Sequence, residues 1–141
     1  MKQAVMLSIE GRQNYVGQDT EVIELVTEGT LEQTELGWII TYEESDLTGM
    51  QGVTTTFQIE RGKLILTRSG KLNSQMVFQE GVRHESLYQM EFGALLLCVC
   101  ARMIRTELTT EGGTVDLSYA IEIEQTETGV IEYHLDIRPK Q

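Results

Sequence analysis

Apolar and polar residues alternate along most of this chain, in short runs separated by glycine. Successive side chains of a β-strand point to opposite faces, so alternation is typical of strands with one buried and one solvated face. In the run 115–125 the first five odd positions carry Val, Leu, Tyr, Ile and Ile, while the even positions are mostly polar. The run 130–138 repeats the pattern. The sequence therefore predicts an all-β protein.

Turn residues divide the chain into ten candidate strands. These are Gln3–Glu10, Val22–Thr30, Gly37–Glu43, Val53–Arg61, Lys63–Arg68, Gln75–Gln79, Glu85–Phe92, Leu95–Glu107, Val115–Gln125 and Val130–Arg138. Short connections pair sequential strands antiparallel, so an up-and-down meander is the simplest topology. Closing the sheet removes exposed edges. We therefore predict a single domain over residues 1–141, an antiparallel, calycin-like up-and-down β-barrel of about eight to ten strands.

One region fits both a strand and a helix. The run 92–104, FGALLLCVCARMI, is apolar at odd and even positions alike. A strand is favoured, and part of a helix remains the alternative. A strand that is apolar on both faces indicates an outer face covered by a neighbouring element, which a second copy of the chain could supply.

The charge of the chain limits its partners. Acidic residues number 22 against 11 basic ones, which gives a net charge of −11. This charge repels nucleic acid phosphates and anionic lipid surfaces, so neither nucleic acid nor a membrane is an expected partner. The longest apolar run, 92–101, is far shorter than the roughly 20 residues of a membrane helix. The first ten residues lack the apolar stretch of a signal peptide, and a cytoplasmic protein is expected.

The cysteines and histidines predict no metal site. Cys98 and Cys100 lie two residues apart, and a disulfide between them would close a tiny, strained loop. The pair could offer two thiolates to a soft metal, but no further ligand follows at a recognisable spacing, and His84 and His134 are isolated. We expect free cysteines in the core, no metal and no cofactor. The sequence also has no phosphate loop or nucleophile elbow, so no catalytic residue is assigned.

Charged and polar residues on the apolar faces of strands are the candidates for a binding site. A guanidinium on such a face needs a carboxylate, a group of carbonyls or an anionic ligand, because an unpaired buried charge is very costly. Tyrosines on inward faces can bind a ligand or fill the core. The alternative for the arginines is a structural role, in which they reach water at the barrel mouths or pair with Glu44 as a plug. The candidate ligand-binding residues are Arg68, Glu44, Tyr42, Tyr88 and Arg102.

Several stretches together resemble the YwiB-like family of small bacterial proteins of unknown function. These stretches are YEESDLTGMQGVTTTFQIERGKLILTRSGKLNSQMVFQEG, YQMEFGALLLCV and EGGTVDLSYAIEI, and the resemblance covers nearly the whole chain. It implies a lipocalin-resembling β-barrel of eight to ten strands and a bacterial, cytoplasmic origin. It implies no activity, because the function of the family is unknown.

Three classes of function remain. The favoured hypothesis is a module that binds one small, anionic and partly apolar ligand in the barrel interior or at its mouth. The alternative is an interaction or scaffold protein that acts through its outer surface as a homodimer, without a ligand. An enzyme is least favoured, because it would need an inward carboxylate such as Glu44 beside Tyr88 or Arg68, and no spacing enforces that geometry.

Overall fold

Ten antiparallel strands form one sheet in the order β6-β5-β4-β3-β2-β1-β10-β9-β8-β7. The computed structural model describes residues 2–15, 17–44, 51–71, 73–90, 93–123 and 126–140, apart from the side chains of 86–90, 94–95 and 126–127. The strands are β1 (Lys2–Tyr15), β2 (Glu21–Gln33), β3 (Gly37–Glu43), β4 (Val53–Glu60), β5 (Lys63–Gly70), β6 (Ser74–Phe78), β7 (Arg83–Met90), β8 (Gly93–Thr109), β9 (Gly112–Ile123) and β10 (Thr126–Pro139).

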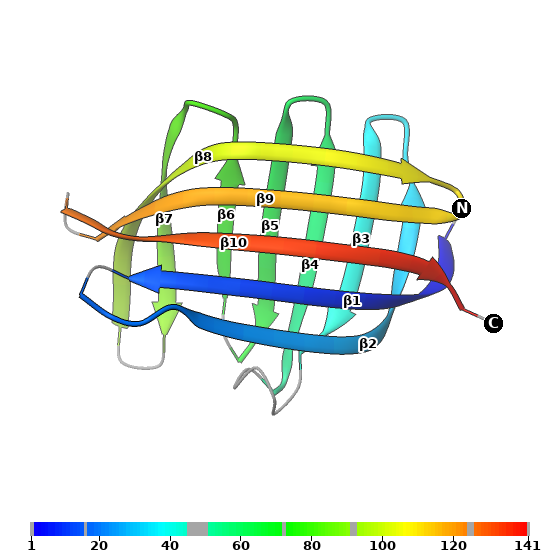
Figure 1. Cartoon of the computed structure of the whole chain (residues 1–141), viewed down its shortest axis with the longest axis horizontal. Helices are drawn as coiled ribbons and strands as arrows, with labels where there is room; N and C mark the ends of the chain where they lie inside the picture. The colour runs from blue at the N-terminus through cyan, green and yellow to red at the C-terminus, as the bar shows by residue number, and fades with distance from the viewer. Residues whose placement is uncertain are drawn as a thin grey trace.

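The sheet folds over itself into two layers whose strands cross steeply. In Figure 1, β8, β9, β10, β1 and β2 run across the front, and β3 to β6 run behind them. Two long strands, β8 and β2, connect the layers at the corners of the barrel. β8 pairs with both β7 and β9, and the end of β2 pairs with β3. At the β2 corner a Cβ on Gly29 would lie 2.6 Å from the carbonyl oxygen of Thr41, so the backbones approach too closely for a side chain.

The barrel is nearly closed. The first and last strands pair along most of their length, which brings the two chain termini to the same end of the front layer (Figure 1). The seam lies between β6 and β7, where the isolated bridges Gln79↔Val82 and Glu80↔Ala101 replace a continuous ladder. All ten predicted strands, the antiparallel meander and the barrel are confirmed. No helix that could span a membrane occurs in the described part of the chain.

The core fills the space between the two layers. Alternation assigns the inward faces of β3, β5, β9 and β10 correctly, and the front and back layers contribute large apolar side chains from facing strands. The largest side chains with almost no exposure are Tyr119, Phe57, Phe78, Leu7, Leu31, Ile40, Leu64, Leu66, Leu117 and Leu135.

The expectation that Cys98, Cys100 and Arg102 lie on the inward face of β8 is wrong. Leu97, Val99 and Ala101 point inward and are buried, whereas Leu96 on the opposite face is 55% exposed. The ladder with β9 is then interrupted by a β-bulge between Ala101 and Met103. One extra residue reverses the alternation, so that Ile104 packs against the core beyond the bulge. The bulge accounts for the inward position of Ile104, whereas Leu96, Cys98 and Cys100 precede the bulge and lie on the outward face.

Candidate functional site

Four polar side chains form a straight row across the back layer. Cross-strand pairing joins Tyr42 to Thr55, Thr55 to Arg68 and Arg68 to Ser74, on β3, β4, β5 and β6. All four are buried. We call them the polar row. The neighbouring row toward the middle of the barrel is apolar and consists of Ile40, Phe57, Leu66 and Met76. The polar row therefore marks one end of an otherwise apolar interior, which we call the Arg68 end.

Arg68 is the central residue of this end. Its side chain is only 6% exposed, as its shared parity with Leu64 and Leu66 predicts. Its Nη2 donates a hydrogen bond of 3.1 Å to the hydroxyl of Tyr133, on β10 in the opposite layer. Its Nε is buried and has no hydrogen-bond partner among the described residues. Burial lowers the pKa of Arg68, but Tyr133 and the other tyrosines around it raise that pKa by more, so the guanidinium stays charged.

Glu44 lies immediately after β3 and is buried as well. The hydroxyl of Thr55 donates a hydrogen bond of 2.5 Å to its Oε2, and Tyr42 is hydrogen-bonded to the same carboxylate. Burial, and next the negative charge of Glu44, raise the pKa of Tyr42 far above its ordinary value of 10. Tyr42 therefore remains protonated and is a hydrogen-bond donor, not an anion.

A cavity of about 80 Å³ brings these groups together. Its polar wall includes Tyr42, Glu44, Arg68 and Tyr133, three of which are sequence-predicted candidates. Its other lining residues come mainly from the front layer and are Ile9, Gly11, Gln13, Ile23, Leu25 and Ile131. The structure thus brings Arg68, Glu44 and Tyr42 into one site, with an arginine and a carboxylate on an otherwise largely apolar surface.

Two candidates from the sequence are not among the described residues of this site. Arg102 is exposed on the outer face of β8, which it shares with Leu96, Cys98 and Cys100. It lines a separate surface hollow with residues such as Tyr15 and Asp19. Tyr88 belongs to β7, but its side chain lies outside those that the structure describes.

Two further residues of the site are not among the candidates predicted from the sequence. Tyr133 has inward parity, but only strand order shows that β10 faces β5 and that its hydroxyl meets Arg68. Gly11 is a buried, inward position of β1 without a side chain, and a Cβ there would lie 3.3 Å from Cε1 of the Tyr133 ring. A glycine where the alternation requires an inward side chain is the signal that indicates space in the interior.

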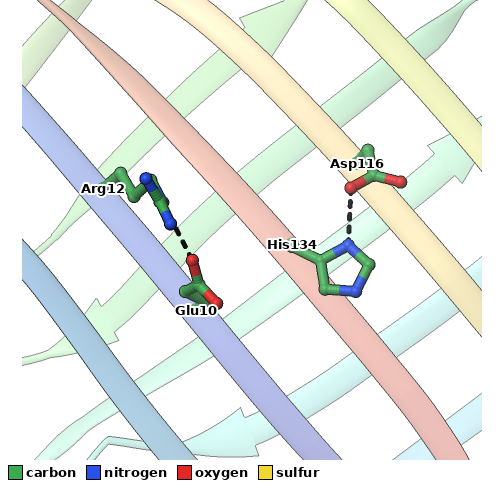
Figure 2. A network of polar contacts seen from close by, with 4 residues as sticks. All are labelled: Glu10, Arg12, Asp116 and His134. Carbon is green, nitrogen blue, oxygen red and sulfur yellow. Dashed lines mark hydrogen bonds and ion pairs between the residues drawn. The ribbon is translucent and has the colours of Figure 1, made fainter.

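A second polar group lies on the outer face of the front layer. His134 Nδ1 is 2.6 Å from Oδ1 of Asp116 on the adjacent strand, and Arg12 pairs with Glu10 over 2.9 Å (Figure 2). The hydrogen bond to Asp116 raises the pKa of His134 above its ordinary value, with smaller contributions from Asp136 and Glu10. These side chains are largely solvated, so the group indicates a polar outer surface.

The cysteines are not core residues. Cys98 and Cys100 are free, half-buried and on the outward face of β8, opposite Leu97 and Val99. Arg83 on β7 is hydrogen-bonded to Cys98 and forms an ion pair of 2.7 Å with Glu122. No group of three or more Cys, His, Asp or Glu side chains arranged to hold a metal ion occurs among the residues that the structure describes.

The other end of the barrel carries a larger, open groove of about 640 Å³. It is lined by Trp38 on β3, by the turn between β4 and β5, by Glu80 and Val82 at the seam and by Ile104 on β8. Within the described residues, both buried side-chain atoms without a hydrogen-bond partner, Arg68 Nε and Ser74 Oγ, belong to the polar row instead. The Arg68 end is therefore the stronger candidate for a ligand site.

The exposed apolar side chains do not test the predicted homodimer. They include Val22 and Val26 on β2, Val82 near the seam and Leu96 on β8. These positions are distributed over strands at different parts of the barrel and do not define one patch. Size-exclusion chromatography with light scattering would decide whether the chain is a monomer or a dimer.

Comparisons with known proteins support the fold and indicate no activity. A domain of unknown function, DUF1934, matches residues 7–137. The uncharacterized beta-barrel protein YwiB of Bacillus subtilis is 30% identical over 105 residues, which cover 73% of this chain and 71% of that protein. The crystal structure of the ywiB protein from Bacillus subtilis superposes with a TM-score of 0.82 at 21% identity, over 96% of this chain and 92% of that one. The chain is therefore a member of the DUF1934 family of β-barrel domains.

Proposed function

We propose that this barrel binds one small carboxylate in the cavity at its Arg68 end. The observation that carries the proposal is the buried Nε of Arg68, which has no hydrogen-bond partner among the described residues although the side chain lines a cavity. Leaving a buried donor of a charged group unsatisfied costs free energy. A carboxylate can accept hydrogen bonds from two N–H groups along one edge of a guanidinium, and such pairs are among the strongest in proteins.

The dimensions of the cavity limit the ligand. Pockets for drug-sized ligands usually have volumes of about 300–1,000 Å³. A cavity of about 80 Å³ accommodates a carboxylate with a short apolar group, but not a long acyl chain. Ile9, Leu25 and Ile131 supply an apolar surface for that group. The proposed role is therefore binding of a small metabolite-like acid, not lipid transport.

The chemistry of the site favours binding over catalysis. Tyr42 is held in its protonated form, and Thr55 hydrogen-bonds the carboxylate of Glu44. The first arrangement keeps a neutral phenol, the second satisfies a carboxylate oxygen, and neither prepares a group for proton transfer. Two free cysteines favour a reducing compartment, and we place the binding function in the cytoplasm on that ground.

Thermal melts with short carboxylates test this function. Binding to the folded state raises the melting temperature, so a panel of branched and linear acids of up to four carbons, with and without an α-amino group, should contain at least one that stabilises the protein. Arg68→Met should abolish that stabilisation. Arg61→Met is the matched control, because Arg61 is exposed in the turn at the opposite end. A panel without any stabilising acid, or an unchanged response in Arg68→Met, contradicts the proposal.

A further inference from the structure

The outer side of the back layer carries two neighbouring rows of residues without a charged side chain. Cross-strand pairing aligns one row across β3 to β6 as Thr41, Thr56, Thr67 and Gln75. It aligns the next row as Ile39, Gln58, Ile65 and Val77. Gln75 is exposed and the other side chains are half-buried, on the face of the sheet opposite to the polar row. We call these two rows the back face, which is the far side of the back layer in Figure 1.

Outward charges on these four strands lie only at their ends. Within β3 to β6, all of whose residues are described, they are Glu43 at one end and the cross-strand pair Glu60 and Lys63 at the other. The outer side of the front layer differs, because five adjacent strands place titratable side chains in one row there. This row consists of Glu24, Glu10, His134, Asp116 and Arg105. The net charge of −11 is therefore carried by parts of the surface other than the back face.

Most side chains of the back face are β-branched and therefore stiff. Isoleucine, valine and threonine have restricted χ1 rotamers, so they lose less conformational entropy than long charged side chains when a partner covers them. Gln58, the longest side chain at the centre, is already held by a hydrogen bond of 2.7 Å from its Nε2 to Oε2 of Glu60. The back face is thus ordered before any partner binds, which lowers the cost of association.

We propose that the back face docks onto the same face of a second copy of this chain and forms a two-fold symmetric dimer. In such an isologous contact both partners supply the same residues, and the two sheets stack about 10 Å apart. The uncharged rows form the centre of the contact, and Glu43, Glu60 and Lys63 form part of its rim, which is the distribution typical of protein interfaces. The ligand cavity lies on the other side of these strands, so the dimer goes beyond the proposed carboxylate binding and does not depend on it.

The distribution of charge favours a second copy as the occupant. A strongly basic or acidic partner would need opposite charges on the back face, and its described residues supply none. Two chains of net charge −11 repel one another, so their contact must set no like charges opposite each other. The back face meets this condition. It also keeps the acidic front layers on the far sides of both barrels, farther from the contact than the Debye length of about 8 Å at physiological salt.

The area of this face is sufficient for a reversible dimer. Four strands at a spacing of about 4.8 Å and the seven residues of β3 at about 3.3 Å each give a projected area of about 440 Å². Side chains raise the accessible area above this projection, and a specific contact requires about 500 Å² or more from each partner. The contact therefore lies near the lower limit of specific interfaces, and we expect the dimer to dissociate on dilution.

Sedimentation equilibrium of the unmodified protein gives the first test. The average mass should rise toward twice that of the chain as the protein concentration increases. Added sodium chloride should strengthen the dimer, because it screens the repulsion between the two negative chains while the contact has no charges at its centre. A mass that stays at one chain at every concentration, or a dimer that added salt weakens, overturns the proposal.

Charged substitutions at the centre of the back face supply the second test. Thr56→Lys and Thr56→Glu each set like charges opposite each other in the dimer, so the dissociation constant of each variant should rise at least tenfold. An equimolar mixture of the two variants should recover the dimer, which also shows that both variants fold. Thr114→Lys is the matched control and should leave the dimer unchanged, because Thr114 is a half-buried threonine on the outward face of β9 in the front layer. A dimer that persists in both Thr56 variants, or one that the mixture does not recover, overturns the assignment to this face.

Discussion

Arg68 and Tyr133 connect the two layers of the barrel through a hydrogen bond of 3.1 Å between Nη2 and the tyrosine hydroxyl. The two residues are 65 positions apart in the chain and lie on β5 and β10, which cross one another in Figure 1. This contact fixes one side of the guanidinium, while its Nε has no hydrogen-bond partner among the described residues. The pair therefore orients the arginine at the cavity.

The stability of Arg68 variants distinguishes a ligand anchor from a structural plug. In the absence of ligand, Arg68→Met should lower the free energy of unfolding by no more than about 1.5 kcal/mol, because methionine keeps the aliphatic stem and loses the one hydrogen bond to Tyr133. Arg68→Ala also deletes the aliphatic stem, so it should be about 2–3 kcal/mol less stable than Arg68→Met. Urea unfolding of both variants measures this. If Arg68→Met is as unstable as Arg68→Ala, the charge itself holds the fold together.

Gly11 offers a way to fill the cavity without touching a charge. A Cβ at this position lies 3.3 Å from Cε1 of Tyr133, a contact that a small shift of the ring relieves. We expect Gly11→Ala to change the free energy of unfolding by less than about 1 kcal/mol and to weaken carboxylate binding at least tenfold. Isothermal titration of the variant checks the affinity. Unimpaired binding would place the ligand elsewhere.

The reversed faces of β8 predict unequal effects of two neighbouring substitutions. Leu97 is buried and Leu96 is 55% exposed. Leu97→Ala should therefore destabilise the protein by about 2–5 kcal/mol, and Leu96→Ala should stay within about 0.5 kcal/mol of the unmodified protein. Denaturant midpoints of the two variants provide the comparison. Equal destabilisation would indicate that Leu96 is covered in solution, as a homodimer through this face requires.

His134 should make stability depend on pH through Asp116. The hydrogen bond to Asp116 raises the pKa of His134 in the folded state above its unfolded value of about 6.5. A raised folded-state pKa gives a stabilisation that is complete below the unfolded pKa and is lost as pH rises through the folded pKa. The unmodified protein should therefore exceed Asp116→Asn in stability by more at pH 6 than at pH 9. An Asp19→Asn control should show no such difference, and equal gaps at both pH values would refute this role of the pair.

Much of this site follows from alternation alone. Arg68, Glu44 and Tyr42 were selected because each shares its parity with apolar neighbours, and the structure places all three on the cavity. Parity assigns a face but not a neighbour across the barrel, so Tyr133 could be identified as inward but not as the partner of Arg68. That contact depends on β1 pairing with β10, which closes the sheet and brings β10 in front of β5.

Arg102 shows where alternation fails. The run 95–101 is apolar on both faces, and the face that Arg102 shares with Leu96 is the outward one, since Leu97, Val99 and Ala101 are buried. A covered strand and a helix both produce a run that is apolar at odd and even positions, so the sequence does not show which face is inward. Only the pairing with β9 separates these explanations.

The most direct test of the account observes the Arg68 Nε–H group itself. In ¹⁵N-labelled protein, the Arg68 side-chain Nε–H resonance is assigned by its absence in Arg68→Met. The account predicts that this resonance shifts progressively during titration with the acid or amino acid that raises the melting temperature, and that the Arg61 resonance does not. An Arg68 resonance that stays unchanged while the ligand saturates the protein would contradict the claim that Arg68 binds a carboxylate.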